Sequence, residues 1–260
     1  MASSKGTALI TGASVGLGRE FARLFAADGY DVALVARSED KLRDLANELA
    51  QAHGVRAQVI AQDLTDPGAP ARIVEAAAAA GFSIDFLVNN AGFGSSGRFY
   101  ELEAKRELEM VQVNISALLL LTRLALPGMV ARKRGRVLNI ASTAGFQPGP
   151  GMATYYATKA FVLSFSEAIA QELKGSGVTV TAHCPGATLT EFAHAADIEK
   201  SRLFQMAAAD AKTVARHGYR AMHRGQVVAV QGFTNWLLTQ SLRLSPRFAV
   251  RAIAAWINSK

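Results

Sequence analysis

The chain contains a single cysteine, few charged residues and no long uninterrupted hydrophobic run. Cys184 excludes an intrachain disulfide, and its apolar surroundings predict a buried thiol. Residues 1–6 are too short and polar for a signal peptide, and the longest aliphatic run, near residues 117–121, is far too short to span a bilayer. These features predict a cytoplasmic protein without an integral membrane segment. No group of histidines and cysteines has metal-ligand spacing, so no metal site is expected.

Charged residues make up 19% of the 260 residues and hydrophobic residues 50%. This composition excludes wholesale disorder and predicts one well-packed domain over residues 1–260. The net charge of +7 would attract polyanions, but the basic residues are scattered along the chain. Their densest group, residues 132–136, has no interleaved aromatic side chains and is interpreted as a solvated loop, so no nucleic-acid partner is expected.

Strand-like apolar runs alternate with segments of helical periodicity along the whole chain. This alternation predicts an α/β fold: a single Rossmann-like, doubly wound domain with a seven-stranded parallel sheet flanked by helices on both faces. The expected strands are residues 7–11, 31–36, 56–61, 85–89, 136–142, 178–184 and 226–230. The expected helices are residues 17–28, 39–52, 70–80, 104–130, 155–174 and 209–223.

Two segments fall outside this alternation. Residues 187–206 are too long for a simple connection and predict a substrate lid. Residues 231–260 mix large apolar side chains with arginines and predict a C-terminal helical extension. The extension could pack on the domain, cover the substrate mouth, form a subunit contact or rest on a membrane surface, and packing within the protein is favoured over the membrane.

A glycine-rich turn follows the first expected strand and leads into a helix. Its glycines permit positive φ and let the backbone approach a pyrophosphate, which the amides and dipole of the helix N-terminus then stabilise. The spacing is GxxxGxG. The candidate cofactor-binding residues of the turn are Gly12, Ser14, Gly16, Leu17 and Gly18.

Arg37 follows the second expected strand, where an acidic residue would suit the 2′-hydroxyl of an adenine ribose. An arginine suits a 2′-phosphate instead, through charge-assisted hydrogen bonds. Because no acid occupies this strand end, the sequence predicts a preference for NADP(H) over NAD(H). Val15, inside the glycine turn, adds no second cation, so strict exclusivity is not predicted.

Tyr155 and Lys159 stand four residues apart in an expected helix, and Tyr155 stands thirteen residues after Ser142. The four-residue step puts both side chains on one helix face, where the ammonium group would lower the pKa of the phenol. A phenol made acidic in this way can exchange a proton with a carbonyl or an alcohol. Four-residue spacing alone is common by chance, so the interpretation depends on the rest of the chain.

Further motifs stand in register with the turn Thr11 to Gly18, Ser142, and Tyr155 with Lys159: they are Asp63 with Leu64, Asn89 to Gly92, Asn114, and Pro185 with Gly186 and Thr190. With them, the chain resembles the short-chain dehydrogenase/reductase family over nearly its whole length. The resemblance implies that Tyr155 is the general acid in reduction and the base in oxidation, and that Ser142 hydrogen-bonds the substrate oxygen. It implies that Lys159 binds the nicotinamide ribose and that Asn114 holds a water connecting Lys159 to solvent.

The same resemblance implies the remaining cofactor contacts. Asp63 would reach the adenine amine with Leu64 packed nearby, Asn90 would support the central strands, and Gly92 would let the cofactor lie close to the backbone. Thr190 would contact the carboxamide after Pro185 and Gly186, with Thr188 as the alternative. Tyr156 does not fit the motif spacing and is not expected to carry the proton.

Apolar side chains around the expected site predict a small hydrophobic carbonyl or alcohol as substrate. The chain is therefore expected to be an NADP(H)-dependent oxidoreductase, with a 3-ketoacyl-(carrier protein or CoA) reductase as the alternative. A non-catalytic NADP-sensing protein is disfavoured because the catalytic set is intact. The resemblance also implies a homodimer or homotetramer formed through the helix at Tyr155. The candidate substrate contacts are Phe146, Met152, Leu189 and Phe192.

Overall fold

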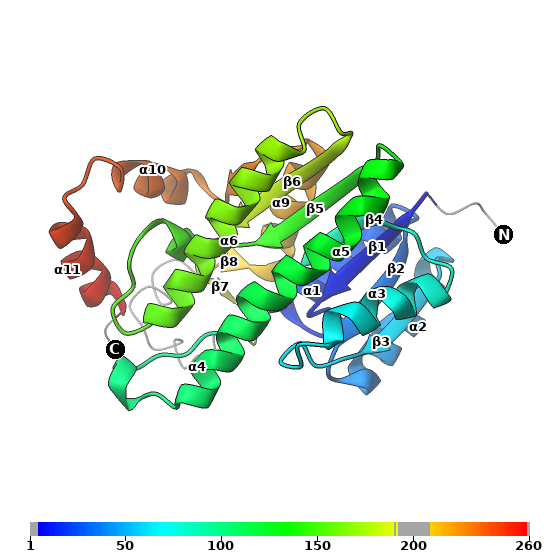
Figure 1. Ribbon diagram of the computed structural model, residues 1–260, viewed down its shortest axis with the longest axis horizontal. Helices are drawn as coiled ribbons and strands as arrows, with labels where there is room; N and C mark the ends of the chain where they lie inside the picture. The colour runs from blue at the N-terminus through cyan, green and yellow to red at the C-terminus, as the bar shows by residue number, and fades with distance from the viewer. Residues whose placement is uncertain (1–4, 190, 192–208, 259–260) are drawn as a thin grey trace.

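The computed structural model describes residues 5–189, 191 and 209–258. Seven parallel strands form one sheet in the order β3-β2-β1-β4-β5-β6-β9, with helices on both faces (Figure 1). This confirms the predicted doubly wound fold. The strand order reverses between β1 and β4, which is where open α/β sheets place a ligand crevice. The strands are β1 Thr7–Thr11, β2 Asp31–Ala36, β3 Ala57–Ala61, β4 Ile84–Asn89, β5 Gly135–Ile140, β6 Val178–Cys184 and β9 Val228–Val230.

The sheet is buried on both faces, and successive residues of β1 show this directly. Ala8 and Ile10 pack in one cluster with residues of α1, α2 and α9, whereas Leu9 packs in a second cluster with residues of α3 and α5. Strands covered on both faces read as continuous apolar runs, which explains why their positions could be predicted. The helices named here are α1 Gly16–Ala27, α2 Glu39–His53, α3 Ala69–Ala79, α5 Leu118–Ala131 and α9 Ala211–His223.

The predicted helix over residues 104–130 is divided into three parts. α4 (Ala104–Val111) and α5 are joined by a π-helical segment, η2 (Gln112–Ala117). By length and composition the stretch Ala104–Ala131 could cross a membrane, but 44% of its most apolar window is buried inside the fold. Packing of Leu121, Ala125 and Met129 in the core accounts for this apolarity.

The other predicted helices and strands lie within two residues of the observed ones. β5 ends at Ile140, so Ser142 stands just beyond the strand rather than inside it. The predicted helix from residue 209 begins at Ala211, because Ala209–Asp210 forms β8 and pairs with β7 (Thr188–Leu189). Most of the predicted lid, residues 190 and 192–206, lies outside the described residues.

Residues 233–258, here called the C-terminal arm, form two helices beyond the last strand, α10 (Phe233–Ser241) and α11 (Arg247–Asn258). Figure 1 shows them at the left of the view, beyond β6 and α6. Asn258 returns to the body: its Oδ1 accepts a hydrogen bond from the Tyr156 hydroxyl at 3.0 Å, and its Nδ2 donates to the Pro150 carbonyl at 3.0 Å. The far end of the arm is thus fixed beside α6 (Ala153–Glu172).

A buried polar network links the central strands to the helices that carry the site. Asn89 of β4 donates to Thr122 of α5 at 3.0 Å and to Asn139 of β5 at 2.9 Å. Asn139 in turn donates to Ser166 of α6 at 2.9 Å. Since unpaired buried amides are costly, this network fixes α5 and α6 in position against β4 and β5.

Candidate active site

Ser142 and Tyr155 are brought together by the turn that follows β5. Ser142 caps the short helix η3 (Thr143–Phe146): its Oγ accepts a hydrogen bond from the Ala144 amide at 3.1 Å, and its hydroxyl lies 3.5 Å from the Pro185 carbonyl. Tyr155 lies in the first turn of α6 and its hydroxyl is hydrogen-bonded to Ser142. The two hydroxyls that were predicted to meet the substrate oxygen are therefore adjacent.

The predicted lowering of the Tyr155 pKa is wrong for this structure. Burial raises the pKa of Tyr155 well above its ordinary value, and the hydrogen bond from Ser142 offsets only part of that effect. The Lys159 ammonium lies 5.7 Å from the centre of the Tyr155 ring and donates a 2.7 Å hydrogen bond to the Ile140 carbonyl. Desolvation therefore dominates the pKa of Tyr155, and the phenol is protonated at neutral pH.

Lys159 is itself buried, with 6% of its surface exposed. Burial lowers the pKa of Lys159 to about 8, because the charged form loses its hydration. The side chain is therefore an ammonium at neutral pH and loses its proton in mildly alkaline solution. It lies about one helical turn from Tyr155, on the same face of α6, as the spacing predicts.

Asn114 lies in the π-helical segment η2, and its amide is fixed on both sides. Its Nδ2 donates to the Phe93 carbonyl at 3.0 Å and to the Thr158 hydroxyl at 3.1 Å, while its Oδ1 accepts from the Phe93 amide at 3.1 Å. A Cβ placed on Gly92 would lie 3.0 Å from Asn114 Oδ1 and 3.7 Å from Lys159 Nζ. Gly92 therefore lies against both polar groups. The water held by Asn114 stays a prediction.

The two adjacent tyrosines have different partners. The Tyr156 hydroxyl is bound to Asn258 of the arm, and its ring is so close to Gly149 that any Cβ at that glycine would overlap with it. Tyr155 is bonded to Ser142 instead. The structure thus separates Tyr156 from the hydroxyl pair, in agreement with the spacing argument.

The glycine-rich turn between β1 and α1 adopts the backbone that its sequence requires. Gly12 and Gly16 have φ of 65° and 52°, and a Cβ on Gly18 would overlap with the Gly12 carbonyl. Asn90 Nδ2 donates to the carbonyls of Thr11 at 2.9 Å and Gly12 at 3.2 Å, so it holds the turn against β4. Ser14 and Leu17 belong to the same turn, whose amides stand at the N-terminus of α1, a geometry suited to a pyrophosphate.

Two further residues, Thr11 and Arg19, stabilise this turn through hydrogen bonds that the sequence did not predict. The Thr11 hydroxyl accepts hydrogen bonds from the amides of Asn90 and Ala91, both at 3.0 Å. Arg19 donates to the Ser14 carbonyl at 2.8 Å. Arg19 could have been suspected as the first charged residue after the glycines, whereas Thr11 has no signal beyond its position in the strand.

The residues predicted for the adenosine end stand after β2 and β3. Arg37 is exposed and forms no hydrogen bond or ion pair with any part of the chain that the structure describes. Asp63 Oδ1 accepts from the Thr65 amide at 3.0 Å, and Leu64 is buried. Because β2 and β3 are neighbours, these side chains lie at one edge of the sheet, beside the glycine-rich turn after β1.

The loop after β6 lies next to Ser142. The Pro185 carbonyl accepts a hydrogen bond from the Thr143 amide at 2.9 Å, and the Thr188 hydroxyl donates to the Gly186 carbonyl at 3.0 Å. A Cβ on Gly186 would lie 2.7 Å from Asn235 Nδ2 of α10. Thr190 and Phe192 lie outside the described residues, so their predicted contacts are not placed.

The predicted substrate contacts occupy different environments. Met152 is buried in a small cluster with Tyr156, against which Tyr155 packs. Phe146 packs on the cluster formed by α5, α6 and β6, so its ring has a structural role. Leu189 is 58% exposed in β7. Of these residues, Met152 lies beside the proton donor, and the contacts themselves stay predictions.

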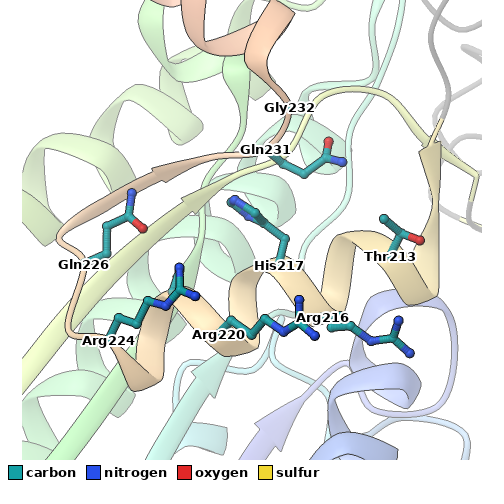
Figure 2. A pocket seen from close by; sticks show the side chains of 9 residues that line it. Thr213, Arg216, His217, Arg220, Arg224, Gln226, Gln231 and Gly232 are labelled. Carbon is teal, nitrogen blue, oxygen red and sulfur yellow. The ribbon is translucent and has the colours of Figure 1, made fainter.

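A separate cavity of about 370 Å³ lies between α9 and the edge strand β9, and none of the candidate catalytic residues lines it (Figure 2). Its lining includes Arg216 and Arg220 of α9 and Arg224 at the end of that helix. His217 at its wall pairs with buried His183 across 3.2 Å between Nδ1 and Nε2, and burial lowers the pKa of His183 to about 3. This pair is neutral at physiological pH. Among the described residues, no group of three or more His, Cys, Asp or Glu side chains could hold a metal ion.

Residues 6–201 match the profile of the short chain dehydrogenase family. The chain is 39% identical over 182 residues to a very-long-chain 3-oxoacyl-CoA reductase from Pyrenophora tritici-repentis, across 66% of this chain and 52% of that protein. It spans about half the length of the first curated relatives it matches.

Two solved structures are similar over nearly their whole length. A short-chain dehydrogenase from Sphingobium yanoikuyae in complex with NADPH is 34% identical with a TM-score of 0.82, covering 92% of this chain and 94% of the other. A bulky-bulky ketone specific alcohol dehydrogenase from Comamonas testosteroni is 31% identical with a TM-score of 0.78, covering 93% of each chain.

Proposed function

This chain belongs to the short-chain dehydrogenase family, and from that premise we propose that it is an NADP(H)-dependent oxidoreductase interconverting a hydrophobic ketone or aldehyde and its alcohol. The observation that carries the proposal is the hydrogen-bonded pair of Ser142 and Tyr155, with buried Lys159 on the same face of α6. The glycine-rich turn after β1 fits the pyrophosphate of the cofactor, and Gly92 leaves room beside Lys159 and Asn114.

The nicotinamide cofactor supplies the hydride when bound, and the protein supplies position and a proton. Ser142 and Tyr155 donate hydrogen bonds to the carbonyl oxygen, and the Tyr155 hydroxyl transfers its proton as negative charge develops there. The Lys159 ammonium stabilises the phenolate that remains, and this attraction is strengthened because Lys159 is buried. Asn114 fixes the backbone of Phe93 beside Gly92 and so shapes the wall of the site.

The pH dependence of the two directions tests this assignment. Because the pKa of Tyr155 is raised, the phenol is protonated near pH 7 and serves reduction, whereas alcohol oxidation requires the scarce phenolate. We expect oxidation to accelerate by about tenfold per pH unit from neutrality to about pH 8 and to level off above it, because Lys159 then loses the charge that stabilises the phenolate. Reduction should be nearly constant up to about pH 8 and decline above it, as Lys159 loses its proton. Initial rates followed by NADPH absorbance in both directions would measure this, and oxidation independent of pH would contradict it.

We propose NADP(H) as the preferred cofactor because Arg37 is exposed after β2 and is not committed to any carboxylate of the described chain. The NADPH complex of the Sphingobium relative supports this choice. For Arg37→Asp, we expect kcat/KM with NADPH to fall by roughly 10- to 100-fold, since a charge-assisted hydrogen bond contributes about 1.5–3 kcal/mol. The value with NADH should stay equal or rise.

Lys174→Asp is the matched control, because it makes the same charge change at an exposed position just after α6. It should leave the ratio of NADPH to NADH efficiency unchanged. An equal loss with both cofactors in Arg37→Asp would show that Arg37 does not read the 2′-phosphate.

The substrate class is tested by a carbonyl panel assayed separately with NADPH and NADH. The panel contains bulky aromatic ketones, medium-chain ketones, 3-oxoacyl-CoA thioesters and 3-oxoacyl carrier protein. The Pyrenophora relative, named for a 3-oxoacyl-CoA, favours the thioester as the second candidate. Binding of NADPH without oxidation of it by any carbonyl would favour a redox sensor and overturn the enzymatic proposal.

We further infer a homo-oligomer formed through α5 and α6. Leu119 and Leu124 of α5 are 39% and 38% exposed, and Phe161 and Phe165 of α6 stack with their ring centres 5.7 Å apart. Apolar side chains on the outer surface of adjacent helices suit a two-fold contact. A mass measured by light scattering during size exclusion would show the assembly.

A further inference from the structure

The C-terminal arm exposes an unusual number of large apolar side chains. Of the sixteen large hydrophobic side chains exposed in the described chain, eight belong to these 26 residues. Leu244, between the two helices, is 91% exposed, and Phe248 is 70% exposed. Large apolar side chains concentrated on one exposed segment are typical of an interaction site. The eight are Phe233, Trp236, Leu237, Leu238, Leu244, Phe248, Ile253 and Trp256.

This exposure coexists with firm attachment of the arm to the body. Val250 and Ala254 of α11 are 7% and 1% exposed, so a narrow stripe of small side chains faces inward. Asn258 adds hydrogen bonds to Tyr156 and Pro150. The arm thus buries its smaller residues and presents its largest ones outward, which is the reverse of a helix built only to complete a core.

The charges on the arm have one sign. Arg243, Arg247 and Arg251 are exposed, and residues 231–260 contain no aspartate or glutamate. None of the three arginines forms an ion pair with the described chain. Aromatic and aliphatic side chains among unpaired arginines are the composition of a segment that lies in the interface of an anionic membrane.

The arm also begins at a cationic cavity. Gly232 lines the cavity of Figure 2, directly before Phe233, the first residue of α10. In that view Arg216 and Arg220 of α9 are followed by Arg224, which caps the end of the helix. Consecutive arginines in this series are four residues apart, a spacing at which like charges on a helix destabilise it by a few tenths of a kcal/mol. A concentration of positive charge therefore adjoins the apolar arm.

We propose that the C-terminal arm docks on an anionic phospholipid surface, with its tryptophans, phenylalanines and leucines in the interfacial layer and its arginines on the lipid phosphates. Tryptophan is enriched at this layer because its ring is apolar with one polar group. The composition favours lipid over a second copy of the chain. A two-fold contact between two arms would place the same arginines together with no acidic partner on either arm.

This inference differs from the expectation that the extension packs within the protein. The helices do pack through Val250 and Ala254, but the eight large apolar side chains of the arm are each at least 47% exposed. Docking does not depend on the proposed activity. If both hold, the bond of Asn258 to Tyr156 places the membrane-facing arm beside the active site, where a hydrophobic carbonyl could enter from the lipid.

Both tryptophans of the chain, Trp236 and Trp256, lie on the arm, so intrinsic fluorescence reports on this surface alone. The full chain is mixed with vesicles of phosphatidylcholine containing phosphatidylglycerol, and with vesicles of phosphatidylcholine alone. We expect a blue shift and sedimentation of the protein with the anionic vesicles at low salt, and much less of both with the neutral vesicles or at high salt.

A charge variant tests the role of the arginines. Arg243→Gln, Arg247→Gln and Arg251→Gln combined should weaken vesicle binding by roughly 100-fold, because each basic residue near an anionic surface contributes about 1 kcal/mol. The matched control removes three exposed charges elsewhere: Arg98→Gln, Lys105→Gln and Lys174→Gln. It should bind nearly as well as the natural chain.

Two results would overturn the proposal. The first is natural protein that stays in the supernatant with anionic vesicles at low salt and shows no blue shift. The second is a blue shift that grows with protein concentration without vesicles, together with a larger mass that Trp256→Ser reduces, which would identify the arm as a contact between copies. Neither readout uses catalysis, so failure here is distinguishable from failure of the proposed reaction.

Discussion

Tyr155→Phe is expected to slow carbonyl reduction by NADPH about 1,000-fold while leaving NADPH binding nearly unchanged. The substitution removes one hydroxyl, the one bonded to Ser142, and keeps the ring that packs against Tyr156. Without that hydroxyl no group in the pair can release a proton with comparable ease, since the Ser142 hydroxyl is less acidic than a phenol. Stopped-flow or steady-state oxidation of NADPH on the best ketone of the panel would measure the loss, and NADPH fluorescence titration would measure binding.

The neighbouring residue provides the control. Tyr156→Phe removes a hydroxyl one position along the same helix, where the partner is Asn258 rather than Ser142. It should keep activity within about tenfold, because it loses one neutral hydrogen bond of about 1 kcal/mol at the arm. Equal losses in the two variants, or unchanged turnover in Tyr155→Phe, would remove Tyr155 from the proton transfer.

Lys159→Met is expected to lower activity by two to four orders of magnitude and at the same time to raise stability, by about 1 kcal/mol or more. The pKa of Lys159 falls from an ordinary 10.5 to about 8 in the folded protein. At pH 7 the charge is therefore buried in the fold but hydrated in the unfolded chain, which costs stability. The cost decreases as pH rises from about 8 to 10.5, where the unfolded chain still holds the proton and the fold does not.

Methionine removes this cost and fills much of the same space. The Ile140 carbonyl loses the hydrogen bond that Lys159 donates at 2.7 Å, which cancels part of the gain in stability. Urea unfolding at pH 7 and NADPH oxidation should thus change in opposite directions. The control is Lys105→Met, at a side chain that is 78% exposed, where neither quantity should change appreciably. A variant that loses both stability and activity would mean that Lys159 is chiefly a structural residue.

The fold could be predicted from the sequence because its strands and its glycine turn are each recognisable from a short stretch of residues. Strands buried on both faces read as apolar runs, and a glycine turn with φ of 65° at Gly12 can be recognised from its residues alone. The meeting of Ser142 and Tyr155 at one site was implied by the family resemblance. These features depend on short stretches of chain rather than on the details of packing.

What could not be predicted depends on tertiary contacts. The π-helical turn that holds Asn114 keeps the apolar pattern of an ordinary helix, so no periodicity marks it. The direction of the Tyr155 pKa shift was wrong because the extent of desolvation is a property of the assembled site. The partner of Tyr156 is 102 residues away, at the end of the arm.

The two hydrogen bonds of Asn258 have a practical meaning for protein engineering. They join the arm to Tyr156 on α6 and to Pro150 in the loop that leads to Met152, so the arm and that loop form one mechanical unit. A chimera that takes the arm from a relative but keeps the native loop would lose these two hydrogen bonds. Libraries aimed at new substrates should therefore exchange residues 146–156 and 233–258 together, always from the same parent.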